Sequence, residues 1–351
     1  MSSAAGIAPF SEDQAESIRM VRDNAAGIAD GVARARALRF SMPGFSPDVW
    51  RQMGTMGWIG LAVPEAAGGS GLGLAEMCAL NEELGRALAP EPLIGGALSA
   101  ALLADVGDTH LLPKLLAGEA VVLTAWQDRP NTLIPCLDRD ATRRFIPMGG
   151  GATHFLLPVG DALHCVEAAA CELRHEATHD GGHLSSLRAP SGRSLGRVAL
   201  TPALDRATLG TAAYLLGGME AAFALTLDYL KTRQQFGKII GTFQVLQHKA
   251  ADIKLQIALS RAAVEQAAAA GDAGLMGDEA AALISRAKAR VSEAAQSVGQ
   301  ACIQLSGGIG YTDDYDVGLY LRKTMVLAPA FGGAALHRAR FMALSPDMED
   351  A

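Results

Sequence analysis

The sequence predicts a mainly helical α+β protein, in which a helical N-terminal domain is followed by a small β domain and then by a helical bundle. Its 351 residues are enough for two or three domains. Half of them are hydrophobic but only 5% are aromatic, and alanine is abundant, which favours long packed helices over β-sandwiches. The sequence pattern changes near residues 120 and 199, so we expect domains at 1–119, 120–198 and 199–351.

Helix-start signals predict where the helices of the N-terminal domain begin. Ser11, followed three residues later by Gln14, forms a capping box, which predicts a helix that continues to about residue 37. Ser46 and Pro47 begin a second helix, because proline fits the first helical position, where its missing N–H costs nothing. After a turn-rich loop, further helices are expected at 73–88, 92–105 and 109–117.

The β domain and the bundle differ in the spacing of their apolar residues. The short runs 121–126 and 154–159 are separated by Gly, Pro, Asp and Asn, which is typical of strands joined by turns. In the bundle, apolar residues recur at i, i+3, i+4 and i+7. The apolar run 209–227 contains Glu220, so we interpret it as a buried helix and not as a membrane span. Long helices are expected at about 205–232, 242–271 and 277–305.

Charge and cysteine content exclude several functions. The net charge of −7 argues against nucleic acid or an anionic membrane as a partner. The N-terminus has neither the basic start nor the apolar run of a signal peptide, so we expect a cytoplasmic protein. We expect no metal site, and we expect reduced thiols, because the five scattered cysteines show no CxxC spacing: Cys78, Cys136, Cys165, Cys171 and Cys302.

Two C-terminal segments carry a resemblance to a known family. The first is Thr-Arg-Gln-Gln-Phe-Gly-Lys-Ile-Ile at 232–240, followed by Phe-Gln at 243–244. The second is Gln-Leu-Ser-Gly-Gly-Ile-Gly-Tyr at 304–311, followed by Leu-Tyr-Leu-Arg at 319–322. In order and spacing they resemble the signatures of acyl-CoA dehydrogenases, and the loop at 64–72 looks like that family's N-terminal motif. The resemblance implies a helical domain, a middle β-barrel and a C-terminal four-helix bundle.

The resemblance also implies FAD as the cofactor and assigns residues to it. Arg233 is similar to the arginine that reaches the FAD pyrophosphate of the neighbouring subunit, where a guanidinium pairs well with phosphate. Phe236 would pack on that flavin, and Gln244 would hydrogen-bond its adenosine side. The alternative for Arg233 is a surface cation at a helix end. For Gln244 and Gln304 it is a helix-capping or solvent-facing amide. The full set is Arg233, Gln235, Phe236, Phe243, Gln244, Gln304, Leu305, Ser306, Gly307 and Gly308, in which the glycines would allow close backbone approach.

The catalytic base of the family is missing. In the family a glutamate takes the α-proton of an acyl-CoA thioester while the β-hydride passes to the flavin. Counting from the 319–322 segment places the base position at Phe331, and counting back from Arg233 places the alternative position at Ala207. Asp205 lies two residues from Ala207, about 200° around a helix, so it should point elsewhere. We therefore predict no catalytic residue in this chain.

The β domain departs from the family as well. It looks shorter, and the segments 125–130 and 144–148 stand where the family has loops that embrace the isoalloxazine ring. We interpret Trp126 as core packing rather than as a flavin platform. The part of the site that would hold a flavin within its own subunit is thus reduced, whereas the part that would hold a neighbour's flavin is retained.

One arrangement accounts for both observations. The chain would pair with a related catalytic subunit that holds the isoalloxazine and the base, and would complete the FAD site across the interface. This resembles the α2β2 acyl-CoA dehydrogenases of bacterial steroid side-chain degradation, with the acyl-CoA bound through the partner and an electron-transfer flavoprotein or similar protein as acceptor. The alternatives are a homomeric flavoenzyme with desulfinase-like chemistry and a flavin-free scaffold protein.

Overall fold

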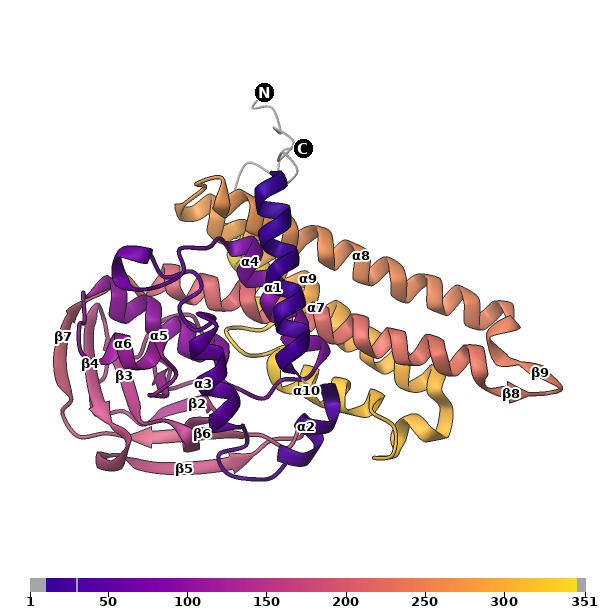
Figure 1. The fold of residues 1–351 in the computed structure, drawn as a ribbon, viewed down its shortest axis with the longest axis horizontal. Coiled ribbons are helices and arrows are strands. Elements are labelled where there is room, and N and C mark those ends of the chain that lie inside the picture. The colour runs from indigo at the N-terminus through magenta and orange to yellow at the C-terminus, as the bar shows by residue number, and fades with distance from the viewer. Residues whose placement is uncertain (1–10, 30, 346–351) are drawn as a thin grey trace.

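The computed structural model describes residues 11–29 and 31–345. Two β-sheets form one end of the molecule, and the long helices of the bundle extend from them toward the opposite end (Figure 1). The N-terminal helices are α1 (Glu12–Ala29), α2 (Gly31–Leu38), α3 (Pro47–Thr55), α4 (Leu74–Arg86), α5 (Leu93–Asp105) and α6 (Leu111–Leu116). Of these, α4 packs on the bundle, and α5 packs on both the bundle and strand β1 (Val122–Thr124).

Helix caps explain where the N-terminal helices begin. The Ser11 hydroxyl accepts a hydrogen bond from the Gln14 N–H at 3.2 Å, but the Gln14 side chain donates to Asp272 instead of closing the expected capping box. Asp272, at the end of the bundle helix α8 (Gln244–Asp272), also accepts the N–H groups of Leu74 and Ala75 at the start of α4. One carboxylate therefore fixes the junction of the N-terminal domain with the bundle.

The middle region consists of a four-stranded and a three-stranded sheet. The first has the strand order β1-β3-β4-β7, in which β1 runs parallel to β3 and the other pairs are antiparallel. The second is antiparallel with the order β2-β6-β5. The strands are β1 (Val122–Thr124), β2 (Arg143–Pro147), β3 (His154–Val159), β4 (Ala162–Glu167), β5 (Glu172–Ala177), β6 (His183–Arg188) and β7 (Arg193–Arg197).

The bundle contains three long and two shorter helices. α7 starts five residues earlier than expected, whereas α8 and α9 follow the expected ranges within two residues. Close packing of α4 on α7 requires glycine, because a Cβ at Gly217 would lie 1.9 Å from the Glu82 carbonyl oxygen and one at Gly85 would lie 2.0 Å from that of Tyr214. The other helices are α7 (Leu200–Thr232), α9 (Gly277–Ser306), α10 (Val317–Leu327) and α11 (Ala334–Leu344).

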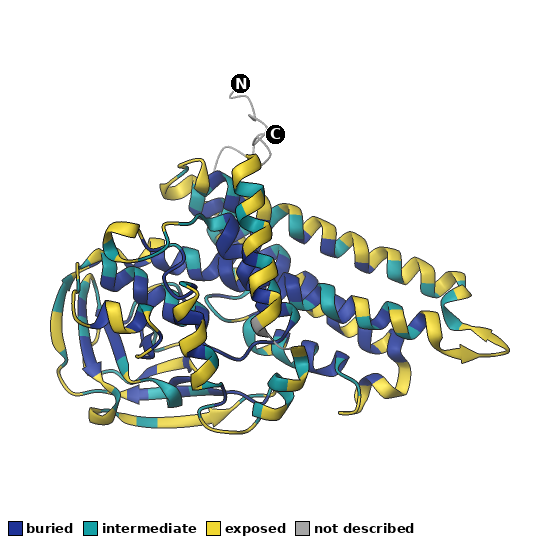
Figure 2. Cartoon of the chain, in the orientation of Figure 1, coloured by how far each residue is buried: buried dark blue, intermediate teal, exposed yellow. Residues whose placement is uncertain are grey.

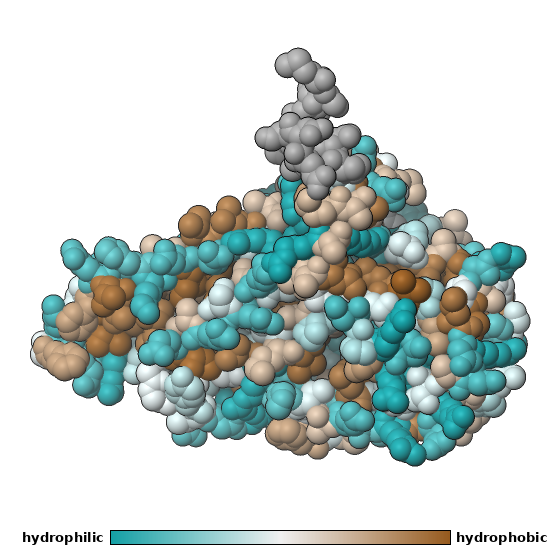
Figure 3. Space-filling model, turned by 180° about the vertical axis from the view of Figure 1, so that it is seen from behind, coloured by the Kyte–Doolittle hydropathy of each residue, from teal (hydrophilic) through white to brown (hydrophobic). Residues whose placement is uncertain are grey.

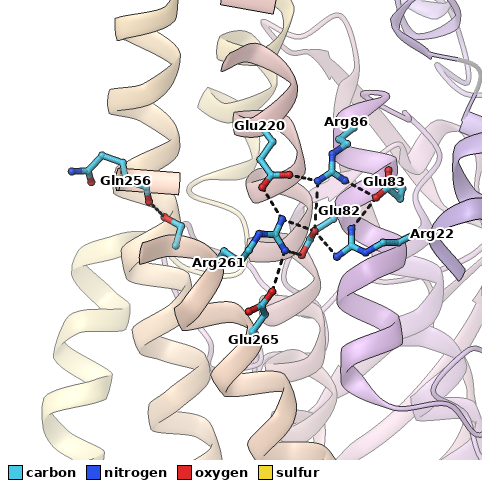
Figure 4. Close-up of polar contacts among 9 residues, drawn as sticks. Arg22, Glu82, Glu83, Arg86, Glu220, Gln256, Arg261 and Glu265 are labelled. Atoms are coloured by element: carbon cyan, nitrogen blue, oxygen red, sulfur yellow. Dashed lines mark hydrogen bonds and ion pairs between the residues drawn. The ribbon is translucent and has the colours of Figure 1, made fainter. Parts of the chain in front are cut away.

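A network of arginines and carboxylates joins α1, α4, α7 and α8 (Figure 4). At its centre is Glu82, whose side chain is only 2% exposed and which accepts from Arg22 at 2.8 Å and Arg261 at 3.0 Å. Glu220, the charge inside the apolar run 209–227, pairs with Arg261 at 2.7 Å and with Arg86. The buried-helix interpretation of that run is confirmed, since no helix within the described residues combines the length and apolar character that a membrane span requires.

Candidate functional site

A short hairpin projects from the far end of the bundle, between α7 and α8 (Figure 1). Its strands are β8 (Gln234–Gln235) and β9 (Lys238–Ile239), joined by Phe236 and Gly237 with φ of 55° and 76°. Positive φ at both central residues is typical of a type I′ turn, in which glycine is favoured and phenylalanine is strained. The turn carries Phe236 outward, where its side chain is 90% exposed.

The residues around this hairpin are exposed and lack compensating charges. The Phe236 ring meets the Phe243 ring edge-on at 6.2 Å, and the Lys238 ammonium lies 4.4 Å from the centre of the Phe243 ring. Arg233 and Gln244, at the end of α7 and the start of α8, are both exposed. In the part of the chain that the structure describes, no carboxylate pairs with the Arg233 guanidinium, so its N–H groups are free for an anion.

The second predicted segment lies at the same end of the bundle. α7 and α9 both end where α8 begins, which brings the 304–308 segment to the hairpin end. Gln304 is exposed, whereas the side chains of Leu305 and Ser306 are buried and the Ser306 hydroxyl donates to Cys302 O at 2.8 Å. Leu305 and Ser306 could therefore meet a ligand only through the backbone.

The backbone beyond α9 is open, as the predicted role requires. Gly307 has a φ of 64°, and a Cβ added at Gly307 or Gly308 would meet nothing within 4 Å. A free guanidinium, an exposed aromatic face, exposed amides and open glycine backbone together suit the phosphates and rings of a dinucleotide. The residues present thus fit the outer part of a bound FAD. Their roles in binding it remain predictions.

A cleft of about 810 Å³ lies elsewhere, between α5, the β domain and the turn that joins α10 to α11. The Phe331 ring stacks on Trp126, with the ring centres 6.3 Å apart and an angle of 14° between the planes. Trp126 is 5% exposed, in agreement with its interpretation as core packing. The aromatic residue at the predicted base position therefore lines the cleft and covers one face of Trp126.

Carboxylates also line this cleft, which the sequence analysis missed. Asp180 pairs with Lys323 of α10 at 2.5 Å and accepts from the Gly182 N–H at 3.2 Å. Burial opposes ionisation of Asp180, but Lys323 and these hydrogen bonds hold the pKa of the carboxyl below its ordinary value. Glu91, also buried, pairs with Arg34. Asp180 and Glu91 are both bound to cations, an arrangement that serves structure better than proton abstraction. Glu176 of β5 also lines the cleft, but its side chain is exposed to solvent.

The second base position is buried, at the edge of a small cavity of about 40 Å³. Ala207 is buried within α7, and Thr208 donates its hydroxyl hydrogen to Leu204 O at 2.7 Å in the same helix. Asp205 points away, as expected, and accepts two hydrogen bonds from the Arg340 guanidinium of α11, one of them at 2.9 Å. Neither Phe331 nor Ala207 can take a proton from a substrate.

Comparison with known proteins identifies the family. The family models for the N-terminal and C-terminal domains of acyl-CoA dehydrogenases match residues 14–119 and 196–343. The acyl-CoA dehydrogenase IpdE2 of Mycobacterium tuberculosis is 31% identical over 88% of this chain and 91% of its own length. IpdE2 of Mycolicibacterium smegmatis is 29% identical over 90% of this chain and 95% of its own.

Solved structures agree in fold. A variant of the Tcur3481–Tcur3483 steroid ACAD shares 30% identity, with a TM-score of 0.84 over 96% of this chain and 100% of that chain. The ChsE4–ChsE5 complex from Mycobacterium tuberculosis shares 23% identity, with a TM-score of 0.82 over 98% of this chain and 99% of that chain. The fold and these comparisons place the chain among the flavoprotein oxidoreductases. This chain belongs to the acyl-CoA dehydrogenase family, whose cofactor is FAD.

Proposed function

We propose that this chain is the base-less subunit of a heteromeric acyl-CoA dehydrogenase and completes the FAD site of a related catalytic subunit. One contrast carries the proposal. Both base positions hold apolar side chains, Phe331 and Ala207, whereas Phe236 is 90% exposed and the Arg233 guanidinium has no carboxylate partner among the described residues. A self-sufficient enzyme needs both parts of the site in one chain. A scaffold protein has no reason to keep a strained, exposed aromatic residue beside a free guanidinium.

Each residue at the hairpin end has a defined task in this proposal. Bound FAD supplies the hydride acceptor for α,β-dehydrogenation of the acyl-CoA thioester. Arg233 donates hydrogen bonds to the pyrophosphate, and Gln244 and Gln304 donate or accept on the adenosine side. Phe236 covers a ring face and excludes water from it. The partner provides the carboxylate that takes the α-proton, and an electron-transfer flavoprotein or similar protein in the cytoplasm accepts the electrons.

The surface of the bundle supports a partner subunit. The outward side of α8 is exposed along most of its length (Figure 2). Seen from behind, the projecting end of the molecule carries several apolar patches among polar ones (Figure 3). Exposed apolar residues in this part of the chain are Phe236, Ile239, Val245, Leu255, Leu259 and Ile309. Apolar area at the projecting end is typical of a surface that a second chain covers.

One relative supports a substrate class for the proposed complex. The 30% identical solved structure is a variant of the Tcur3481–Tcur3483 steroid ACAD. We propose a steroid side-chain CoA thioester as the substrate of the complex. The partner would be a related dehydrogenase chain that retains its glutamate.

Flavin content tests the proposal. The purified chain alone should be nearly colourless at 450 nm, whereas the co-expressed complex should be yellow. Arg233→Ala should weaken FAD binding by the complex about ten- to a hundred-fold, because charge-assisted bonds to phosphate contribute about 1.5–3 kcal/mol. Lys231→Ala, on the last turn of the same helix, is the matched control and should bind FAD normally.

The alternatives predict other results. One tightly bound FAD per chain in a homomer would support a self-sufficient flavoenzyme and contradict the proposal. Unaltered FAD binding by the co-expressed Arg233→Ala variant would remove the cross-subunit role.

A further inference from the structure

A buried lysine on α9 binds the backbone of the turn between α10 and α11, residues 328–333. The Lys288 side chain of α9 donates hydrogen bonds to Ala328 O at 2.7 Å and to Gly332 O at 3.0 Å, and its Nζ lies 3.1 Å from the Ser292 hydroxyl. Lys288 is 0% exposed, and no carboxylate among the described residues forms an ion pair with it. Burying an amine without an opposite charge is costly, so these hydrogen bonds must stabilise the turn.

The arrangement suits both protonation states of Lys288. An ammonium donates three hydrogen bonds, one to each neighbour. A neutral amine donates two to the carbonyl groups, which only accept, and accepts the third from the Ser292 hydroxyl. Lys288 therefore holds the turn whether or not it carries the third proton.

A buried histidine holds the same turn at a second point. His337 Nε2 lies 2.8 Å from Phe331 O, and because a carbonyl only accepts, Nε2 carries the hydrogen. His337 Nδ1 then accepts from the Ser285 hydroxyl at 3.3 Å. Burial lowers the pKa of His337 to about 4, helped by the cations Lys288 and Arg340, so the ring is neutral at neutral pH.

A third contact ties the turn to the β domain. The Asn131 side-chain oxygen accepts from the Gly333 N–H at 2.9 Å, next to the stack of Phe331 on Trp126. Phe331 itself has a φ of 54°, in the left-handed region that bulky residues avoid. Such strain persists only where the surroundings fix the backbone, and here four hydrogen bonds from three side chains do so.

We infer that the 328–333 turn is a latched plug, which keeps Phe331 on Trp126 and excludes a flat aromatic ligand from this chain's own cleft. Lys288 and His337 are positioning residues that act through the turn, and Asn131 is the contact that a surface substitution can remove. The inference concerns the chain's own cleft and goes beyond the proposed role at the partner's FAD site. Phe331 occupies the position beside the Trp126 ring where a planar ligand ring in the cleft could stack instead.

Riboflavin is the probe for the plug. It carries the isoalloxazine ring but no phosphate, so its binding does not involve Arg233, and the result is separate from the cross-subunit proposal. We expect Phe331→Ala to bind riboflavin about tenfold more tightly than the wild-type chain, measured by quenching of flavin fluorescence. Phe331→Tyr keeps the ring and should behave as the wild type. Equal affinity in the wild type and Phe331→Ala would overturn the plug.

Hydrogen exchange tests the latch. Lys288→Met keeps the stem but removes every donor, and should speed amide exchange in the 328–333 turn and raise riboflavin affinity about threefold. Val264→Ala, on α8, truncates a fully buried side chain that makes no hydrogen bond to this turn, and is the control for general destabilisation. Should Lys288→Met fail to fold, Asn131→Ala removes one contact at the surface and should loosen the same turn. A turn that exchanges as in the wild type, or equally fast in the control, would overturn the latch.

Discussion

The bundle carries one strained phenylalanine at the hairpin and one at the 328–333 turn beside the cleft, and the surroundings of the two differ. We call these two regions the hairpin end and the cleft end. At the hairpin end, Phe236 is 90% exposed and the Arg233 guanidinium has no carboxylate partner in the described chain. At the cleft end, Phe331 stacks on Trp126, and its turn is fixed by buried hydrogen-bond donors such as Lys288. Both ends carry a phenylalanine at positive φ, with values of 55° and 54°.

The difference between the two phenylalanines indicates where this chain meets other molecules. Strain at Phe331 is offset within the chain by hydrogen bonds and stacking. Among the described residues, Phe236 has an edge-on ring contact with Phe243, and its turn is flanked by the short β8–β9 pairing. An exposed and strained aromatic residue that the fold itself hardly uses is what a binding surface requires. At the cleft end, by contrast, contacts within the chain stabilise the strained residue.

The largest effect is expected from breaking the ion-pair network around Glu82, which joins α1, α4, α7 and α8 between the hairpin and the β domain. Glu82→Gln removes the buried charge that Arg22 and Arg261 share, and should lower the free energy of unfolding by about 3 kcal/mol in urea denaturation. Glu265→Gln, in the same network but 48% exposed, is the control and should cost less than about 1 kcal/mol. Equal losses in the two variants would show that the buried Glu82 stabilises the packing of these helices no more than the exposed Glu265 does.

The pH dependence of stability sharpens the view of the cleft end. Burial lowers the pKa of Lys288 to about 7, against an ordinary value of 10.5. Between these values the unfolded chain binds a proton that the folded chain lacks, so stability rises with pH. The wild type should therefore gain up to about 1.4 kcal/mol per pH unit between pH 7 and 9 relative to Lys288→Met. The pKa of the neighbouring His337 in the folded chain, about 4, lies below this window, and parallel curves for the two proteins would contradict the assignment.

How far the sequence predicts these features depends on whether the signal is local. The long helices and the Ser46 cap follow from periodicity and capping, both of which are local. The orientation of Asp205 away from the Ala207 position follows from helix geometry alone, although its buried pairing with Arg340 does not. At Ser11 only one of the two hydrogen bonds of the capping box forms, because the Gln14 side chain binds Asp272, which is far along the chain.

The latch could not be predicted from the sequence. Lys288 stands in the middle of an amphipathic helix, where a lysine usually faces solvent. Its burial depends on a turn about forty residues later that folds over it, and no spacing rule connects the two. The histidine at 337 and the cation-paired carboxylate at 180 were missed for the same reason. The motif positions 233–244 and 304–308 were found because they are contiguous in sequence.

A smaller effect is expected from restoring a carboxylate at the cleft end. Phe331→Glu loses the stack on Trp126 and should cost about 1–2 kcal/mol of stability. The variant should remain inactive toward acyl-CoA with an artificial electron acceptor, because the β-domain loops at 125–130 and 144–148 differ from those of the family. Dehydrogenation by the isolated variant would mean that the cleft lacks only its base.

The smallest effect on stability, and the sharpest test of the comparison, is expected at the hairpin. Asparagine followed by glycine is strongly favoured at the two central positions of a type I′ turn, where Phe236 and Gly237 stand. Phe236→Asn relieves backbone strain and gives up little packing, because the side chain is 90% exposed. The isolated chain should therefore be unchanged or more stable by a few tenths of a kcal/mol.

The same substitution should harm the complex. Without the aromatic face the co-expressed pair should bind FAD several-fold more weakly, although the isolated chain is at least as stable as before. Phe236→Tyr, which keeps the ring at the same φ, is the matched control and should bind FAD as the wild type does. Thermal unfolding of the isolated chains and FAD titration of the complexes measure the two effects separately. A Phe236→Asn chain that is clearly destabilised would show that this phenylalanine serves the fold, and that the two ends of the bundle do not differ as argued.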